Sequence, residues 1–231
     1  MERHFDDELE KFNTNLLKMA ALTENAIHRS VEALKNQDKE MAQKVIEDDK
    51  QIDDMENQIE EEAIDLLALF QPMAKDLRSI TTGMKINAEL ERIADLCENV
   101  CHRVLETADE PLLKPLIDLP LLAENAKKML KNAIDSFVQR NEEVAKNVIL
   151  SDERSNELRS IIMKELIYDY MVKDGTTAPR AVALLLITRD LERISDHAVA
   201  IAEDVIYMIR AKVVKHHLSS LKEILTSETE D

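Results

Sequence analysis

The stretch LERIAD at Leu90–Asp95 has a close copy, LERISD, at Leu191–Asp196. These stretches lie 101 residues apart, and a second match has almost the same separation: NEEVAKNVI at Asn141–Ile149 aligns with DKEMAQKVI at Asp38–Ile46, 103 residues earlier. Two matches at nearly one separation indicate an internal duplication. A repeat of about 100 residues also has the length of a small domain. The sequence therefore predicts two tandem copies of one unit.

Apolar residues recur at helical spacing in each copy, as Leu9, Phe12, Leu16 and Met19 do near the start. The 231 residues include only 2 glycines and 5 prolines, which β architectures with many turns need repeatedly. We therefore expect an all-α fold of two tandem homologous three-helix bundles with six long helices. The expected helices cover about residues 2–35, 39–70, 73–106, 121–139 and 142–172, and a sixth runs from near Pro179 to about Lys215.

Three prolines, Pro111, Pro115 and Pro120, fall within ten residues and mark the linker between the copies. The predicted division is a first repeat at 1–108, a Pro-rich linker at 109–120, a second repeat at 121–215 and a polar tail at 216–231.

Charge and composition exclude several classes of protein. The formal net charge is −17, and no basic run is long enough to offset the repulsion from a phosphate backbone, so we expect no binding to nucleic acid. The acidic N-terminus lacks the apolar stretch of a secretory signal, and no window approaches about 18 uninterrupted apolar residues. Cys97 and Cys101, four residues apart, suit free thiols in a reducing compartment. We expect a cytoplasmic protein.

Paired carboxylates are the main chemical signal. Glu91 with Asp95, and their copies Glu192 with Asp196, have the i, i+4 spacing that puts both carboxylates on one helix face. A single such pair is most often part of a solvated face, but repetition inside a matched block favours a metal site.

Other acidic residues extend these pairs. Asp49 and Asp53 on the second helix are also four apart, and their repeat equivalents are Asp152 and Asn156, so the second site has one carboxylate fewer. Glu98 follows Asp95 at +3. The candidate metal ligands are Glu91, Asp95, Glu192, Asp196, Asp49, Asp53 and Asp152.

Enzyme motifs are not found in the sequence. There is no glycine-rich phosphate loop and no plausible catalytic triad, so we expect a protein that is not an enzyme. A carboxylate-bridged metal enzyme stays as an alternative of a different class.

Several segments carry a likeness to a known family: Leu67–Arg78, Leu90–Asp95, Asp190–His197, Ile201–Tyr207 and the linker Glu110–Pro115. In these segments the chain resembles the PhoU family of accessory regulators of phosphate-specific transport, and the resemblance covers about Phe5 to Val213. It implies two three-helix bundles with an acidic site on each. Some members of the family hold multinuclear iron or zinc clusters there, so the resemblance implies a transition metal, iron or zinc.

The resemblance also implies partners. The family binds the ATPase of the phosphate ABC transporter and a phosphate-sensing histidine kinase, and it represses the phosphate-starvation response when phosphate is plentiful. We expect membrane association only through these partners, and a homodimer. A PhoU-like accessory protein of a proton- or sodium-coupled phosphate transporter is a second alternative.

Overall fold

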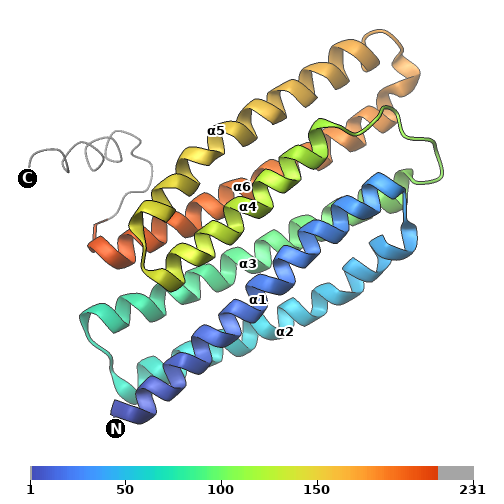
Figure 1. The fold of residues 1–231 in the computed structure, drawn as a ribbon. Coiled ribbons are helices and arrows are strands. Elements are labelled where there is room, and N and C mark those ends of the chain that lie inside the picture. Colours follow the sequence, from blue (N-terminus) through green and yellow to red (C-terminus); the bar gives the residue numbers. More distant parts are fainter. Residues whose placement is uncertain (1, 213–231) are drawn as a thin grey trace, which may run out of the picture.

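The computed structural model describes residues 2–212 and is built from helices (Figure 1). The described residues contain no strand, which confirms the predicted all-α class. The elements are α1 (Glu2–Asn36), α2 (Lys39–Phe70), α3 (Ala74–Thr107), α4 (Asp118–Gln139), α5 (Glu142–Glu165), the π-helical segment η1 (Leu166–Met171), the 3₁₀ turn η2 (Gly175–Thr177) and α6 (Ala178–Arg210).

Each half contains three helices, and matching residues begin the second helix of each half. Asp38 accepts a hydrogen bond from the backbone N–H of Met41 at 2.9 Å and caps α2. Asn141, its repeat equivalent, accepts bonds from Glu143 and Val144 and caps α5. These caps satisfy N–H groups that have no partner inside the helix. The two halves therefore share local detail as well as helix order.

Three predicted boundaries were wrong. Helix α4 begins at Asp118, inside the predicted linker 109–120, because Pro120 falls in the first turn, where a proline removes no helical hydrogen bond. The predicted helix 142–172 changes at Glu165 into a π-helical segment, in which the N–H of Val172 bonds the carbonyl of Ile167. Helix α6 ends at Arg210, before the predicted Lys215, because Ala211 is left-handed with φ 56°.

The predicted tail at 216–231, and the last residues assigned to the sixth helix, lie outside the described residues.

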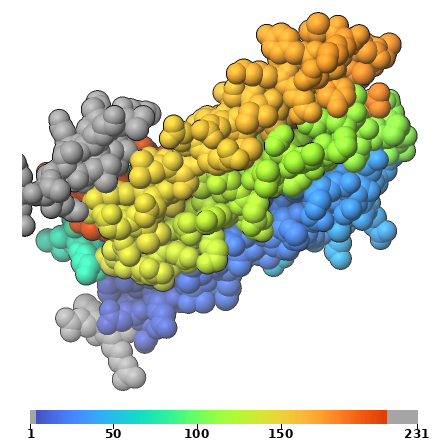
Figure 2. Space-filling view, turned by 45° about the horizontal axis from the view of Figure 1, so that its top comes forward, coloured from blue at the N-terminus to red at the C-terminus, as the bar shows by residue number. Residues whose placement is uncertain are grey.

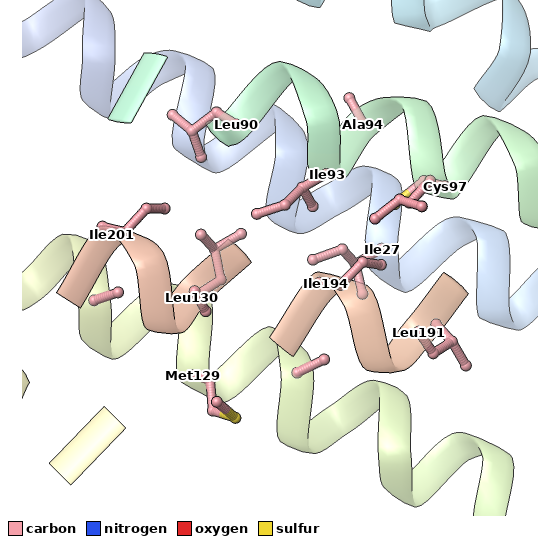
Figure 3. Packing of buried hydrophobic residues seen from close by; sticks show 14 of the residues in the cluster. Ile27, Leu90, Ile93, Ala94, Cys97, Met129, Leu130, Leu191, Ile194 and Ile201 are labelled. Carbon is pink, nitrogen blue, oxygen red and sulfur yellow. The ribbon is translucent and has the colours of Figure 1, made fainter. Parts of the chain in front are cut away.

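One continuous core joins the two halves along a seam between α3 and α6 (Figure 3). The side chains that line this seam recur at intervals of three and four residues on each helix, which is the spacing of a single helix face. They include Leu90, Ile93 and Cys97 of α3 and Leu191, Ile194 and Ile201 of α6, with Ile27 of α1 and Leu130 of α4 beside them, and all are buried. The halves also meet where α1 lies beside α4 (Figure 2).

Polar contacts across the seam show that α3 and α6 are antiparallel. Lys85 near the start of α3 contacts Asp204 near the end of α6 at 3.0 Å. Further along α3, Glu89 contacts Nδ1 of His197 at 2.5 Å. Residues further along α3 thus contact residues earlier in α6, as in an antiparallel pair of helices. Since the matched motifs lie mid-helix on both, the antiparallel seam brings the two LERIAD-type segments close to each other.

Candidate metal centre

The first carboxylate site lies where α2 packs against α3. Asp49 of α2 and Asp95 and Glu98 of α3 each offer one carboxylate oxygen, and these oxygens lie within 4.8 Å of one another. Oxygen ligands bind divalent cations at about 2.0–2.6 Å, so the oxygens around one ion are at most about 5 Å apart. The three side chains are therefore close enough to bind a single cation.

Further carboxylates surround these three. Burial raises the pKa of the Asp49 carboxyl to about 7, and the charges of Asp53, Glu98, Asp95 and Glu91 add to the rise. Burial also raises the pKa of Asp95, again with help from Glu98 and Asp53. Like charges that raise one another's pKa are close and poorly neutralised. A bound cation would relieve this repulsion.

Glu91 lies at the edge of the group. Burial raises its pKa, and Asp95, Glu56 and Asp53 raise it further, while Arg92 lowers it. The Arg92 guanidinium bonds Glu89 at 2.8 Å, so its charge is shared with a residue outside the group. Glu91 and Asp53 thus belong to the acidic surroundings of the three close ligands.

The site opens to solvent on one side and rests on the core on the other. Asp95 and Asp53 are exposed, while Asp49 and Glu98 are half-buried. Beneath them Cys97 is fully buried, and burial raises the pKa of its thiol well above the usual range. Cys97 therefore stays a neutral core thiol, and the expected cation would be held by oxygen atoms alone.

The second set of predicted ligands also comes together, between α5 and α6. Burial raises the pKa of Asp152, and the charge of Asp196 raises it further. The pKa of Glu192 is raised in the same way by burial and by Asp196. However, the described residues contain no other group of three ligand atoms as close as those of Asp49, Asp95 and Glu98.

Three basic side chains lie near this second set. Burial raises the pKa of Asp196, whereas the charges of His197, Arg159 and Arg193 lower it. Arg159 Nε lies 3.3 Å from a carboxylate oxygen of Glu192. Asp152 accepts a hydrogen bond from the side-chain amide of Asn156 at 2.8 Å. Partners within the protein therefore already face each of the three acids.

Two residues of the carboxylate sites are not among the ligands predicted from the sequence. Glu98 extends the acidic row of α3, and its i, i+3 spacing from Asp95 places it on the same helix face. Arg159 is not a predicted site residue, although the alignment of the two repeats pairs it with Glu56 of the first half. The sequence contains both the spacing of Glu98 and the alignment of Arg159. Whether these side chains lie near the carboxylates depends on how α2 packs against α3 and how α5 packs against α6.

Comparison with known proteins follows the same two-part pattern. The family model for the PhoU domain matches the chain twice, at residues 16–104 and 119–205. The chain belongs to the PhoU family. Each match covers one three-helix half, so the PhoU match and the predicted duplication describe the same two units.

Relatives and solved structures agree with this membership. The chain is 34% identical over 215 residues to a PhoU homolog 2 of Thermotoga maritima, covering 93% of this chain and 91% of that protein. It is 39% identical over 209 residues to a PhoU homolog of Aquifex aeolicus, covering 90% and 94%. The crystal structure of PhoU from Pseudomonas aeruginosa superposes with a TM-score of 0.86 at 34% identity, over 90% of this chain and 100% of that one.

Within residues 2–212, none of the PhoU helices combines the length and apolar character needed to cross a membrane.

Proposed function

We propose that this PhoU-family protein is a cytoplasmic regulator of phosphate transport and of the phosphate-starvation response, and that it acts by binding other proteins without catalysing a reaction. The main support is that the match to relatives spans both repeats. Both relatives described above carry the name of phosphate-specific transport system accessory protein. At this coverage no large unmatched part of the chain is left to carry a different activity.

The proposed partners are the ATPase of the phosphate ABC transporter and a phosphate-sensing histidine kinase, with membrane association only through them. A net charge of −17 supports docking to basic surfaces, because complementary charge speeds association and selects partners. Such docking weakens as salt rises, since exposed charges are screened over about 8–10 Å at physiological ionic strength. We also propose that the protein is a homodimer.

Metal binding at the first site is proposed to assist this docking. Asp49, Asp95 and Glu98 would hold a transition metal ion, iron or zinc, and Glu91 and Asp53 would add negative charge around it. Carboxylates from facing helices also bind iron in other helical bundles. The ion would neutralise acidic charge on the surface where α2 meets α3, and so change which partner surface that region attracts.

Deletion of the gene tests the regulatory proposal. In a strain grown with ample phosphate, we expect the deletion to switch on starvation genes such as a secreted alkaline phosphatase, and the intact gene to silence them again. Pull-down from the complemented strain should recover the transporter ATPase or the sensor kinase. Silent starvation genes together with recovery of a proton- or sodium-coupled phosphate transporter would favour that system as the partner. Oxygen-dependent turnover by the metal-loaded protein would favour a metal enzyme.

Metal content tests the first site separately. We expect protein purified without added metal to retain iron or zinc, and Asp95→Asn/Glu98→Gln protein to lose it. Asp54→Asn/Glu61→Gln is a matched control, because it removes two exposed carboxylates from α2 away from the three close ligands. Equal metal in the site variant and the control would refute the assignment.

A further inference from the structure

We infer that the second carboxylate set of this chain binds no metal ion, because the guanidinium of Arg159 occupies the place of the cation; the contrast with the first set rests on the metal binding proposed above. The two halves, although copies, would then neutralise matching carboxylates in different ways.

Arg159 is positioned as a permanent counter-ion. Its Nε lies 3.3 Å from Glu192 Oε1, and the Glu192 side chain is only 14% exposed. Burial raises the pKa of both Glu192 and Asp196, and the positive charge of Arg159 opposes that rise. A guanidinium is always protonated in proteins, so this neutralisation needs no external ion.

The repeat register shows what was exchanged between α2 and α5. At the separation of 103 residues that aligns Asp49 with Asp152, Arg159 stands where the first half has Glu56, and Asn156 where it has Asp53. The second half thus loses two carboxylates on this helix and gains a cation.

The same comparison on α3 and α6 removes a third carboxylate. At the separation of 101 residues that aligns Asp95 with Asp196, Val199 stands where the first half has Glu98. Glu98 is one of the three close ligands of the first site, and valine offers no donor atom in its place. Two of the three close positions are therefore retained, as Asp152 and Asp196, but the third is lost.

The remaining donors are too few and partly engaged. One oxygen of Asp152 accepts a hydrogen bond from Asn156 at 2.8 Å, which leaves the buried Oδ1 as the one oxygen of this carboxylate without a hydrogen-bond partner. His197, beside Asp196, bonds Glu89 across the seam through Nδ1. A divalent cation entering here would meet the charge of Arg159 at close range and would have to displace it from Glu192. The repulsion and the small donor set both oppose binding.

Metal content of first-site and second-site variants tests the inference. The full chain is loaded with Zn²⁺, or with Fe²⁺ without oxygen, desalted and measured by mass spectrometry of the elements. We expect Asp152→Asn/Glu192→Gln protein to keep all the metal of the unmodified protein, and Asp95→Asn/Glu98→Gln protein to keep none. Metal that remains in the first-site variant and disappears when the second-site substitutions are added would overturn the inference.

The failure of the two proposals can be told apart. If the unmodified protein binds no metal, the metal binding proposed at the first site fails, while a metal-free second site stands. If the unmodified protein does bind metal at the first site, the gain-of-function arm decides whether Arg159 is the cause. In this arm the first-site variant also carries Arg159→Glu, Asn156→Asp and Val199→Glu, which give the second set the residues of the first half. This protein should bind the same metal ions as the unmodified first site.

Arg154→Glu is the matched control for that arm. Arg154 lies on the same helix, is exposed and pairs with Glu157 at 3.0 Å, so its replacement makes the same charge change as Arg159→Glu away from the carboxylate set. We expect no metal from Arg154→Glu in the first-site variant. The contrary outcome is that the unmodified first site binds metal but the restored second site does not, although circular dichroism shows it folded. Arg159, Asn156 and Val199 would then not be what excludes the ion, and the inference would be overturned.

Discussion

Gly83 lies where α3 packs closely against α1. A Cβ built there would lie 2.6 Å from the ring of Phe12, whose side chain is fully buried. The ring cannot move away without disturbing the core around it. We expect Gly83→Ala to lower the free energy of unfolding by about 1–3 kcal/mol, the usual cost of overpacking a core.

Urea denaturation measures this change, and Gly175→Ala is its control. No heavy atom lies within 4 Å of a Cβ at Gly175, and its backbone is not left-handed. Alanine there should leave stability unchanged or raise it slightly, because it restricts the unfolded chain. Equal effects of the two substitutions would contradict the role assigned to Gly83.

Asp49 gives the metal-free protein a specific pH dependence. Its folded pKa of about 7 lies above the ordinary value of 3.8 for an aspartate, so between these values the folded state binds more protons than the unfolded state. Stability from this group therefore falls as pH rises from about 4 to about 7. In the presence of a chelator, Asp49→Asn should be more stable than the unmodified protein at pH 8, and the difference should shrink at pH 5.

Thermal unfolding at the two pH values checks this, with Asp54→Asn as an exposed control on the same helix. Added metal should reverse the order at pH 8, because it stabilises the folded protein only where the ligand is retained. A difference between Asp49→Asn and the unmodified protein that does not change with pH would contradict the assignment.

At the level of single residues, sequence alone located the carboxylates but not their partners. The i, i+4 rule identified Asp95, because that rule concerns one helix. Glu98 and Arg159 gained their roles only when a neighbouring helix was placed beside them. Contacts between helices depend on rotation and register, which helix periodicity does not determine.

Among the elements, the junction of α5 and η1 carries an ion pair whose lysine is buried and whose glutamate is half-buried. Lys114, in the connection between the halves, contacts Glu165, the last residue of α5, and the Lys114 side chain is only 6% exposed. We expect Glu165→Gln to destabilise the protein by about 1–3 kcal/mol, because it leaves a largely buried ammonium without its charged partner.

A double-mutant cycle with Lys114→Met measures the coupling between the two side chains. The double variant should recover part of the loss, since no unpaired charge stays buried. Additive effects of the two single substitutions would show that the contact contributes nothing to stability.

Helix periodicity predicted all six long helices but not this junction. The apolar pattern continues through Leu166 and Ile167, so residues 142–172 read as one helix. The π-helical turn changes which carbonyl each N–H meets, as when Val172 bonds Ile167, without changing which residues are apolar. Likewise, Pro120 suggested a linker because a proline in the first turn of a helix and one before it look the same in sequence.

For the whole molecule, the shared core means that one half cannot fold well alone. Residues 1–108 without the second half would expose the α3 face that includes Leu90, Ile93 and Cys97, all fully buried in the full chain. Burial of each such side chain stabilises by about 1.5–3 kcal/mol, so the isolated half loses a large part of its stability.

We expect this fragment to aggregate, to self-associate or to unfold without a cooperative transition. Size-exclusion chromatography and thermal unfolding by circular dichroism are the measurements. A monomeric fragment that unfolds cooperatively would contradict the importance of the seam.

The arginine that faces Glu192 has a consequence for the history of the duplication. Two identical copies would each need a bound metal ion to neutralise their carboxylates, so duplication would increase the demand for metal. A copy that carries its own counter-ion escapes this dependence. In a cell starved of metal, the carboxylates between α5 and α6 would stay neutralised, while those between α2 and α3 would not. A shortage of metal would therefore affect the first half of the protein and spare the second.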